Sequence, residues 1–137
     1  MTAILLYRIS AVVFALFAAG HTMGFLKFTP STPAGVKVRD DMQAVEFPVG
    51  SQIFSYASFY KGFGLCISLY LAFFAYLSWH LSSMAAHNPQ AIGMLGWAMC
   101  ALAAGTLALS WTYFFRVTAM FAAVLVALLA WAAVIAH

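Results

Sequence analysis

Charge is scarce in this sequence. Only 7% of its 137 residues are charged, and Asp and Glu together number 3 against 6 Lys and Arg. Soluble domains carry about 25% charged and about 45–50% apolar residues. Here 66% of the residues are hydrophobic and the mean hydropathy is +0.98. This composition excludes a soluble catalytic domain and predicts an integral membrane protein with a single domain over residues 1–137.

Cysteine is equally scarce. The 2 cysteines, Cys66 and Cys100, stand in apolar runs without CxxC spacing, so neither a metal site nor a redox pair is indicated. A single histidine inside an apolar run, His21, is weak support for an axial haem ligand. We therefore expect no metal and no cofactor. The net charge of +3 comes from basic residues near the ends of apolar runs, where they act as topology signals, and nucleic acid is excluded as a partner.

Long apolar runs make up most of the chain. A helix needs about 20 apolar residues to cross a bilayer. The runs cover approximately residues 3–28, 53–81, 91–114 and 117–136. In the first run, Arg8 and the apolar residues that follow it resemble the charged and apolar regions of a signal peptide. The apolar residues continue to Phe28, however, so we expect this run to be a retained span. The predicted fold class is all-α, an integral membrane four-helix bundle. Only Arg116 and its neighbours are available for the last turn, which predicts a tight antiparallel hairpin of the third and fourth spans.

The loop after the first span holds most of the charge. Thr32 before Pro33 provides an N-cap followed by proline at the first helical position, which predicts a short helix over approximately residues 33–46. The apolar residues of this helix repeat at i, i+4 and i+7, as Val38, Met42 and Val45. Most of the charged residues fall outside that stripe, as in an amphipathic helix on a membrane surface.

The end of the first span places a histidine between two glycines. Gly20 and Gly24 flank His21 and Thr22. In a membrane helix, glycines at this spacing leave a flat stripe that a second helix can approach closely. An ionisable group beside the stripe is costly, so His21 is a candidate site residue. Close packing or a local kink is also expected at Gly62, Gly64 and Gly105.

Two short motifs carry a resemblance to a known family. They are the HTxG segment at residues 21–24 and the FxxGFG segment at residues 59–64, with Met42 between them in the first loop. Together they resemble small bacterial four-helix transmembrane proteins of the LIC type, and the resemblance extends over most of the chain's layout. It implies no activity, but it implies that the two segments pack together beside His21. A tryptophan expected a few residues after HTxG is replaced here by Lys27 and Phe28.

Polar and aromatic residues concentrate at one membrane face. In a four-span chain, the end of the first span, the start of the second, the end of the third and the start of the fourth share that face. The opposite half is nearly pure Ala, Leu, Val and Phe, so the pattern predicts a blind pocket that opens toward the first loop. The candidate ligand-binding residues are His21, Thr22, Glu46, Tyr56, Tyr60, Lys61, Trp111, Tyr113 and Arg116.

Several of these residues have a structural interpretation beside the functional one. His21 either bonds a backbone carbonyl or a tyrosine and holds two helices in register, or contacts a ligand or transfers a proton. Lys27, Lys61 and Arg116 are typical of interfacial anchors. Glu46 is either a solvated loop charge or a partner for Lys61, Arg116 or His21.

Three functions of different classes follow. The first is binding of a lipophilic or amphipathic small molecule at the polar end, which requires the fewest specific residues. A membrane enzyme acting on a lipophilic substrate would use His21 as general acid or base with Glu46 or Tyr60, but a second deeply buried acid is lacking. A homodimeric small transporter would need a polar stripe through the whole membrane, and the apolar half argues against it.

The basic residues also suggest a location. Lys27, Lys37, Arg39 and Arg116 share one face with the first loop. The positive-inside rule places that loop in the cytoplasm and both termini in the periplasm of a bacterial inner membrane. The expected partners are membrane lipids, a lipophilic ligand and a second copy of the chain.

Overall fold

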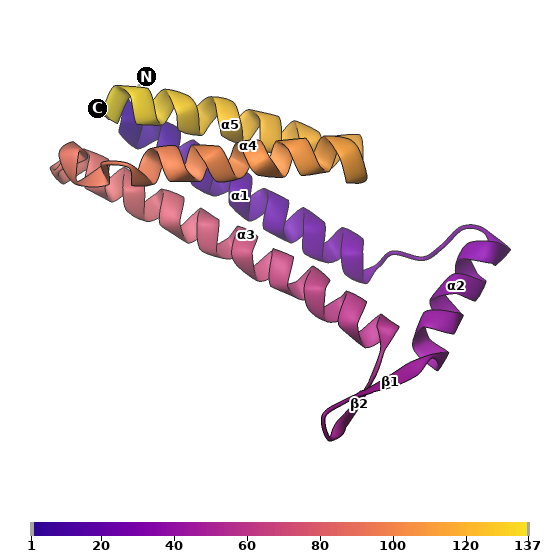
Figure 1. Cartoon of the computed structure of the whole chain (residues 1–137). Helices are drawn as coiled ribbons and strands as arrows, with labels where there is room; N and C mark the ends of the chain where they lie inside the picture. The colour runs from indigo at the N-terminus through magenta and orange to yellow at the C-terminus, as the bar shows by residue number, and fades with distance from the viewer. Residues whose placement is uncertain (1, 137) are drawn as a thin grey trace. The chain divides into compact units, whose positions relative to one another are not determined.

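The protein is all-α, as predicted. The structure, a computed structural model, describes residues 2–136. Its α-helices are α1 (Ala3–Leu26), α2 (Pro33–Ala44), α3 (Tyr56–His87), α4 (Leu95–Tyr113) and α5 (Arg116–Ala136) (Figure 1). Two short strands, β1 (Glu46–Val49) and β2 (Gln52–Ser55), and a 3₁₀ helix, η1 (Pro89–Ile92), complete the described chain. Because α1, α3, α4 and α5 are each long and apolar enough to cross a membrane, this is a multi-pass membrane protein.

The chain forms two compact units. Unit 1 comprises Met1–Phe17 and Leu71–His137, and unit 2 comprises Ala18–Tyr70. The helices α1 and α3 each begin in one unit and end in the other. The packed apolar core and the α4–α5 hairpin belong to unit 1, whereas α2, the two strands and the HTxG and FxxGFG segments belong to unit 2.

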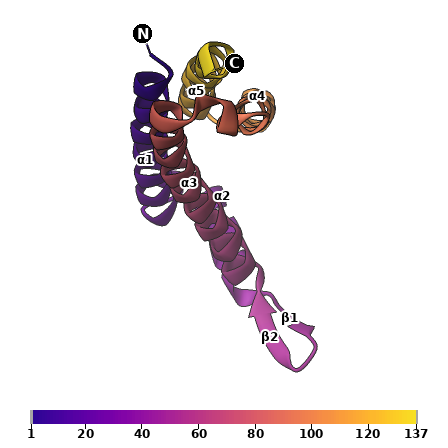
Figure 2. The same ribbon diagram turned by 90° about the vertical axis from the view of Figure 1, so that its left-hand side faces the viewer.

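The core of unit 1 is built on small residues of α5. The helices α4 and α5 lie side by side and antiparallel, which confirms the predicted hairpin (Figures 1 and 2). The Cys100 thiol on α4 lies 3.9 Å from the carbonyl oxygen of Val126 on α5. The stacked rings of Phe17 and Phe121, with centroids 5.1 Å apart, join α1 to α5. The buried residues of α5 are Ala119, Ala122, Leu125, Leu129, Ala132 and Ala133.

The amphipathic helix α2 begins as the sequence predicts. Thr32 adopts an extended conformation, and its hydroxyl accepts a hydrogen bond from the backbone N–H of Gly35 at 3.1 Å. Pro33 occupies the first turn, where a missing N–H costs nothing. The helix ends at Ala44 rather than at residue 46. No residue of α2 is buried, as expected for a helix at a membrane surface.

A β-hairpin that the sequence analysis did not predict follows α2. Strands β1 and β2 pair antiparallel from Glu46 opposite Ser55 to Val49 opposite Gln52 (Figure 2). Gly50 in the turn has φ of 62°, a conformation that glycine adopts without strain. The Gly50-Ser51 pair between two short apolar runs is a sequence signal for such a hairpin.

The spans differ from their expected bounds at the ends. Helix α1 stops at Leu26, and α3 begins at Tyr56 and continues to His87, so residues 82–87 are helical and not part of a loop. Pro89 ends α3, since the residue before a proline is disfavoured in a helix. The 3₁₀ turn and Gly93, with φ of 49°, then delay the start of α4 to Leu95.

Candidate functional site

Phe25, the residue after the HTxG segment, packs against the FxxGFG segment in unit 2. The Phe25 ring on α1 lies so close to Gly64 on α3 that a Cβ at this position would overlap it. The same ring contacts Tyr60, with centroids 5.3 Å apart. Phe25 directly follows the HTxG segment, so this contact places the chain just after HTxG against the FxxGFG segment. Gly64 is required here because an aromatic side chain occupies the space of its missing Cβ.

A polar cluster lies one helical turn from this contact. Nδ1 of His21 is 3.1 Å from the Ser68 hydroxyl, and the Thr22 hydroxyl donates to the same oxygen at 2.8 Å. Thr22 is also 2.7 Å from the carbonyl oxygen of Ala18, and Ser68 is 3.3 Å from that of Gly64. We call His21, Thr22 and Ser68 the His21 cluster. It joins α1 to α3 through side chains in a region that is otherwise apolar.

The imidazole of His21 keeps one nitrogen available. Its ring stacks on Phe25, with centroids 5.9 Å apart and planes 6° from parallel. Within residues 2–136, no hydrogen bond uses Nε2. If Nδ1 accepts from Ser68, Nε2 carries the proton and is a donor; if Nδ1 donates, Nε2 is an acceptor. In both tautomers His21 offers one hydrogen bond from a fixed ring, and in an apolar medium such a group favours a polar partner.

The expected glycine stripe is not a helix contact. A Cβ built at any of four glycines would meet no atom of the described chain within 4 Å: Gly20, Gly24, Gly62 and Gly105. The close approach predicted there occurs at Gly64, and it involves a phenylalanine ring rather than a second backbone. The mistake has a physical origin, because glycine spacing shows where a helix is smooth but not what covers it. Among the glycines described, close packing against another helix also occurs at Gly96 in unit 1.

Tyr56 belongs to a second feature of unit 2. With Val38, Asp41, Met42 and Val45 it lines an open groove of about 230 Å³. The predicted apolar stripe of α2 thus faces one groove. Tyr56 also contacts Phe47 of the hairpin, with ring centroids 4.8 Å apart. This groove holds no hydrogen-bonded polar cluster.

The charged candidates are exposed and do not converge on the His21 cluster. Glu46 stands at the start of β1, and no ion pair joins it to Lys61 in the part of the chain that the structure describes. The ion pairs found there lie within α2, from Lys37 to Asp41 and from Arg39 to Asp40, each at 2.8 Å. These contacts agree with the interpretation of Glu46 as a solvated charge.

The remaining candidates belong to unit 1. Trp111 and Tyr113 are exposed at the end of α4, and Arg116 is the first residue of α5. Of the six candidate residues in unit 2, the structure brings together His21 and Thr22 through their shared partner Ser68, and His21 and Tyr60 through the ring of Phe25.

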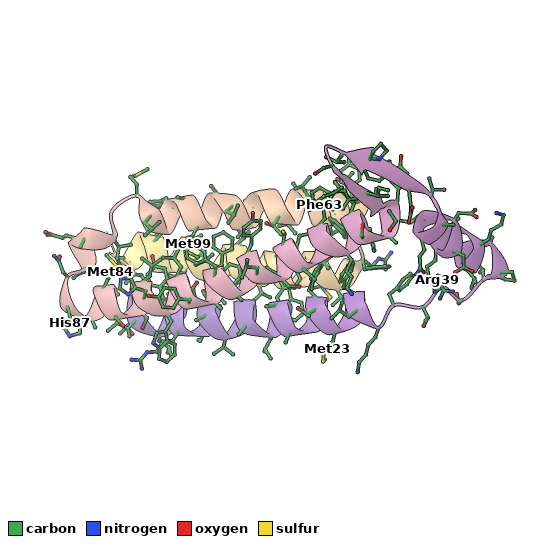
Figure 3. All side chains as sticks on the ribbon, turned by 90° about the horizontal axis from the view of Figure 1, so that it is seen from below. Met23, Arg39, Phe63, Met84, His87 and Met99 are labelled. Atoms are coloured by element: carbon green, nitrogen blue, oxygen red, sulfur yellow. The ribbon has the colours of Figure 1, made fainter. Side chains whose placement is uncertain are left out.

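Ser68 and Phe25 are the site residues that sequence reasoning missed. Ser68 is a polar residue within the apolar run of α3, four positions after Gly64 and eight after Tyr60, so all three share one helix face. The shared helix face of Tyr60, Gly64 and Ser68 is therefore a sequence signal that could have identified Ser68. Figure 3 shows by contrast that Met23, from the HTxG segment itself, points away from α1.

Metal binding has no support from the described side chains. Among residues 2–136, no group of three or more His, Cys, Asp or Glu is placed to hold a metal ion. Comparisons with protein-family models, curated proteins and solved structures gave no match.

Proposed function

We propose that the His21 cluster binds the polar headgroup of a lipophilic small molecule. The observation that carries this proposal is the His21 imidazole, whose Nδ1 is held by Ser68 while Nε2 has no partner within residues 2–136. An unpaired polar nitrogen at membrane depth is costly, so a headgroup that pairs with it binds favourably.

The cluster selects the chemistry of that headgroup. His21, Thr22 and Ser68 carry hydroxyl and imidazole groups and no permanent charge. A neutral hydroxyl or carbonyl group is therefore the best match, since an ion would be desolvated without a counter-charge. The ring contacts from His21 through Phe25 to Tyr60 provide an aromatic surface for an unsaturated chain.

Paired probes test this proposal directly. Farnesol and its deoxy analogue, in which hydrogen replaces the hydroxyl group, share the same isoprenoid chain, so their affinity difference measures headgroup recognition. We expect the wild-type protein in mild detergent to bind farnesol about tenfold more tightly, the effect of one good hydrogen bond in an apolar site. Native mass spectrometry counts the bound probe at each concentration.

Matched histidine variants complete the experiment. His21→Phe keeps a ring to stack on Phe25 but removes both nitrogens. His80→Phe makes the same change at an exposed histidine of unit 1 that stacks on Tyr76, with centroids 6.3 Å apart. The farnesol preference should vanish in His21→Phe and persist in His80→Phe. Equal preference in all three folded proteins would contradict the proposal.

A second function is favoured by the 3.1 Å distance between His21 Nδ1 and Ser68 Oγ. This separation suits a nucleophile and its base. In ester cleavage, Ser68 Oγ would bond the carbonyl carbon and pass its proton to His21, which returns it to the departing alcohol. Water would then hydrolyse the acyl-serine. Sites of this kind have a third group, usually a carboxylate, that orients the histidine. Among the described hydrogen bonds no carboxylate contacts the His21 ring, which argues against this second function.

A fluorophosphonate probe distinguishes the enzyme from the binding protein. Such a probe labels an activated serine covalently, so the enzyme hypothesis expects labelling that Ser68→Ala abolishes. The binding hypothesis expects no labelling of the wild type, while farnesol binding remains. Ser58→Ala, which changes a serine in the first turn of α3, is the matched control.

The location and kinship of the chain are part of the same proposal. We infer a bacterial inner membrane with the first loop cytoplasmic, on the positive-inside rule applied to Lys27, Lys37, Arg39 and Arg116. Kinship with the LIC-type transmembrane proteins is supported by the contact of Phe25, which follows the HTxG segment, with Tyr60 and Gly64 of the FxxGFG segment.

A further inference from the structure

Arg8 is held in a defined position on the outside of unit 1. Its Nε donates to the Ser82 hydroxyl at 3.2 Å, and its guanidinium carbon lies 5.5 Å from the centroid of the Trp79 ring. Ser82 is 1% exposed, whereas Trp79 is 54% exposed. A buried acceptor and an aromatic face thus anchor the arginine while it stays accessible from outside the protein.

The anchored guanidinium has donors to spare. Within residues 2–136, no hydrogen bond uses either Nη atom of Arg8. Because Nε is hydrogen-bonded to Ser82, the edge formed by the two Nη atoms is the part of the guanidinium that is available to a ligand. That edge presents two parallel N–H groups, the geometry that pairs with two oxygens of a phosphate or carboxylate.

Unit 1 contains no acidic side chain to fill this edge. All 3 acidic residues of the chain, Asp40, Asp41 and Glu46, belong to unit 2. Asp40 and Asp41 are already paired within α2. No side chain of unit 1 can therefore supply a counter-ion for Arg8.

The position of Arg8 along α1 points to the source of that counter-ion. It lies five residues after the start of α1 at Ala3, about 8 Å along the helix axis. This is the depth of the headgroup and acyl boundary for a helix that starts at the membrane surface. Trp79 and Tyr76 are exposed tryptophan and tyrosine side chains of the kind found at that depth.

We propose that Arg8, Trp79 and Ser82 form a binding site for the phosphate of an anionic glycerophospholipid. The two Nη groups take two phosphate oxygens, Ser82 fixes the guanidinium, and the lipid chains lie along the apolar surface of α1 and α3. An arginine that merely reached toward water would need neither the buried serine nor the aromatic face. These three residues belong to unit 1, whereas the His21 cluster belongs to unit 2.

The test compares two lipids that differ in the phosphate. Phosphatidylglycerol and the diacylglycerol with the same chains are titrated into the purified protein in mild detergent, and native mass spectrometry resolves the first bound lipid. We expect phosphatidylglycerol to bind about tenfold more tightly to the wild type, because charge-assisted bidentate bonds are strong. Inorganic phosphate is titrated separately as a competitor.

Three variants separate a built site from simple charge. Arg8→Gln removes the guanidinium, and Arg8→Lys keeps the charge without the paired donors. Lys27→Gln removes one charge from the exposed turn that follows α1 and is the matched control. We expect the phosphatidylglycerol preference to be lost in Arg8→Gln, reduced about threefold in Arg8→Lys, and unchanged in Lys27→Gln.

Each outcome decides the proposal. Wild-type preference in Arg8→Lys means that charge alone attracts the lipid and overturns the paired-donor site, and this comparison remains available if Arg8→Gln fails to fold. An equal loss in Arg8→Gln and Lys27→Gln also overturns it. Displacement of phosphatidylglycerol by equimolar inorganic phosphate would show that the site takes free anions instead of lipid.

Discussion

The two units of this protein are packed very differently. Every buried apolar side chain of the described chain lies in unit 1, and α5 alone contributes six buried residues. In unit 2 the only buried residue is Gly64, under the ring of Phe25. Unit 1 is held by buried apolar contacts between helices, whereas unit 2 is held by contacts between partly exposed rings, by the β-hairpin and by the His21 cluster.

This difference favours unit 2 as the place where the proposed ligand binds. Lipid solvates exposed apolar side chains, so unit 2 need not be unstable in a membrane. Its sparse packing instead leaves polar and aromatic groups accessible. Regions with few buried contacts open at low free energy, and binding sites are drawn from them. The mutations below compare a contact in one unit with a matched position that lacks it.

The largest effect is expected in the core of unit 1. Leu129 is 0% exposed, and Leu129→Ala leaves a cavity among closely packed helices. We expect a loss of about 2–4 kcal/mol in the free energy of unfolding. Leu69→Ala in unit 2, at a residue 66% exposed, should change it by less than about 0.5 kcal/mol. Unfolding by SDS in mixed micelles measures both, and similar losses would contradict the packing difference.

A smaller loss is expected where α4 meets Tyr7. A Cβ at Gly96 would lie 2.6 Å from the Tyr7 hydroxyl oxygen and 3.4 Å from Cβ of Ala133. Gly96→Ala should destabilise unit 1 by about 1–3 kcal/mol through overpacking. Gly105→Ala on the same helix meets open space and should be neutral. A neutral Gly96→Ala in the same SDS titration would show that Tyr7 moves aside freely.

The ring contact of unit 2 gives the third comparison. Gly64→Ala places a methyl group where the Phe25 ring lies, while Gly62→Ala meets nothing. We expect Gly64→Ala to cost about 1–2 kcal/mol and to weaken farnesol binding, because α1 and α3 separate beside His21. The double variant Gly64→Ala with Phe25→Ala should recover stability. Additive losses in this cycle would mean that the two residues do not meet.

The smallest effect concerns the hydrogen bonds of the His21 cluster. Ser68→Ala removes the shared partner of His21 and Thr22. Hydrogen bonds between membrane helices contribute about 0.6 kcal/mol on average, so stability should fall only slightly. The farnesol preference should nevertheless shrink, since His21 loses the group that orients its ring. Thr106→Val, which removes a hydroxyl bonded only to its own helix, is the control.

Most of the fold follows from the sequence because hydropathy and helix caps are local signals. The four spans follow from apolar length, α2 from Thr32 and Pro33, and the α4–α5 hairpin from the short turn at Arg116. The strands were missed because Phe47-Pro48-Val49-Gly50 resembles a breaker, and the pairing of β1 with β2 depends on the turn at Gly50.

The site was only partly predictable. His21 stood out because an imidazole in an apolar helix is costly. Its partner Ser68 did not stand out, since serine is tolerated anywhere in a membrane helix by bonding its own backbone. Which residue covers a glycine depends on the register of two helices, and sequence spacing within one helix does not give that register.

Photoaffinity labelling would test the central claim most directly. A diazirine derivative of farnesol, activated by light in the wild-type protein and in His21→Phe, marks the residues beside the bound molecule. We predict labelled peptides from residues 18–26 and 56–70 in the wild type, with the signal lost in the variant. Labelling concentrated on α4 and α5, or equal labelling of unit 2 in both proteins, would contradict a headgroup site at the His21 cluster.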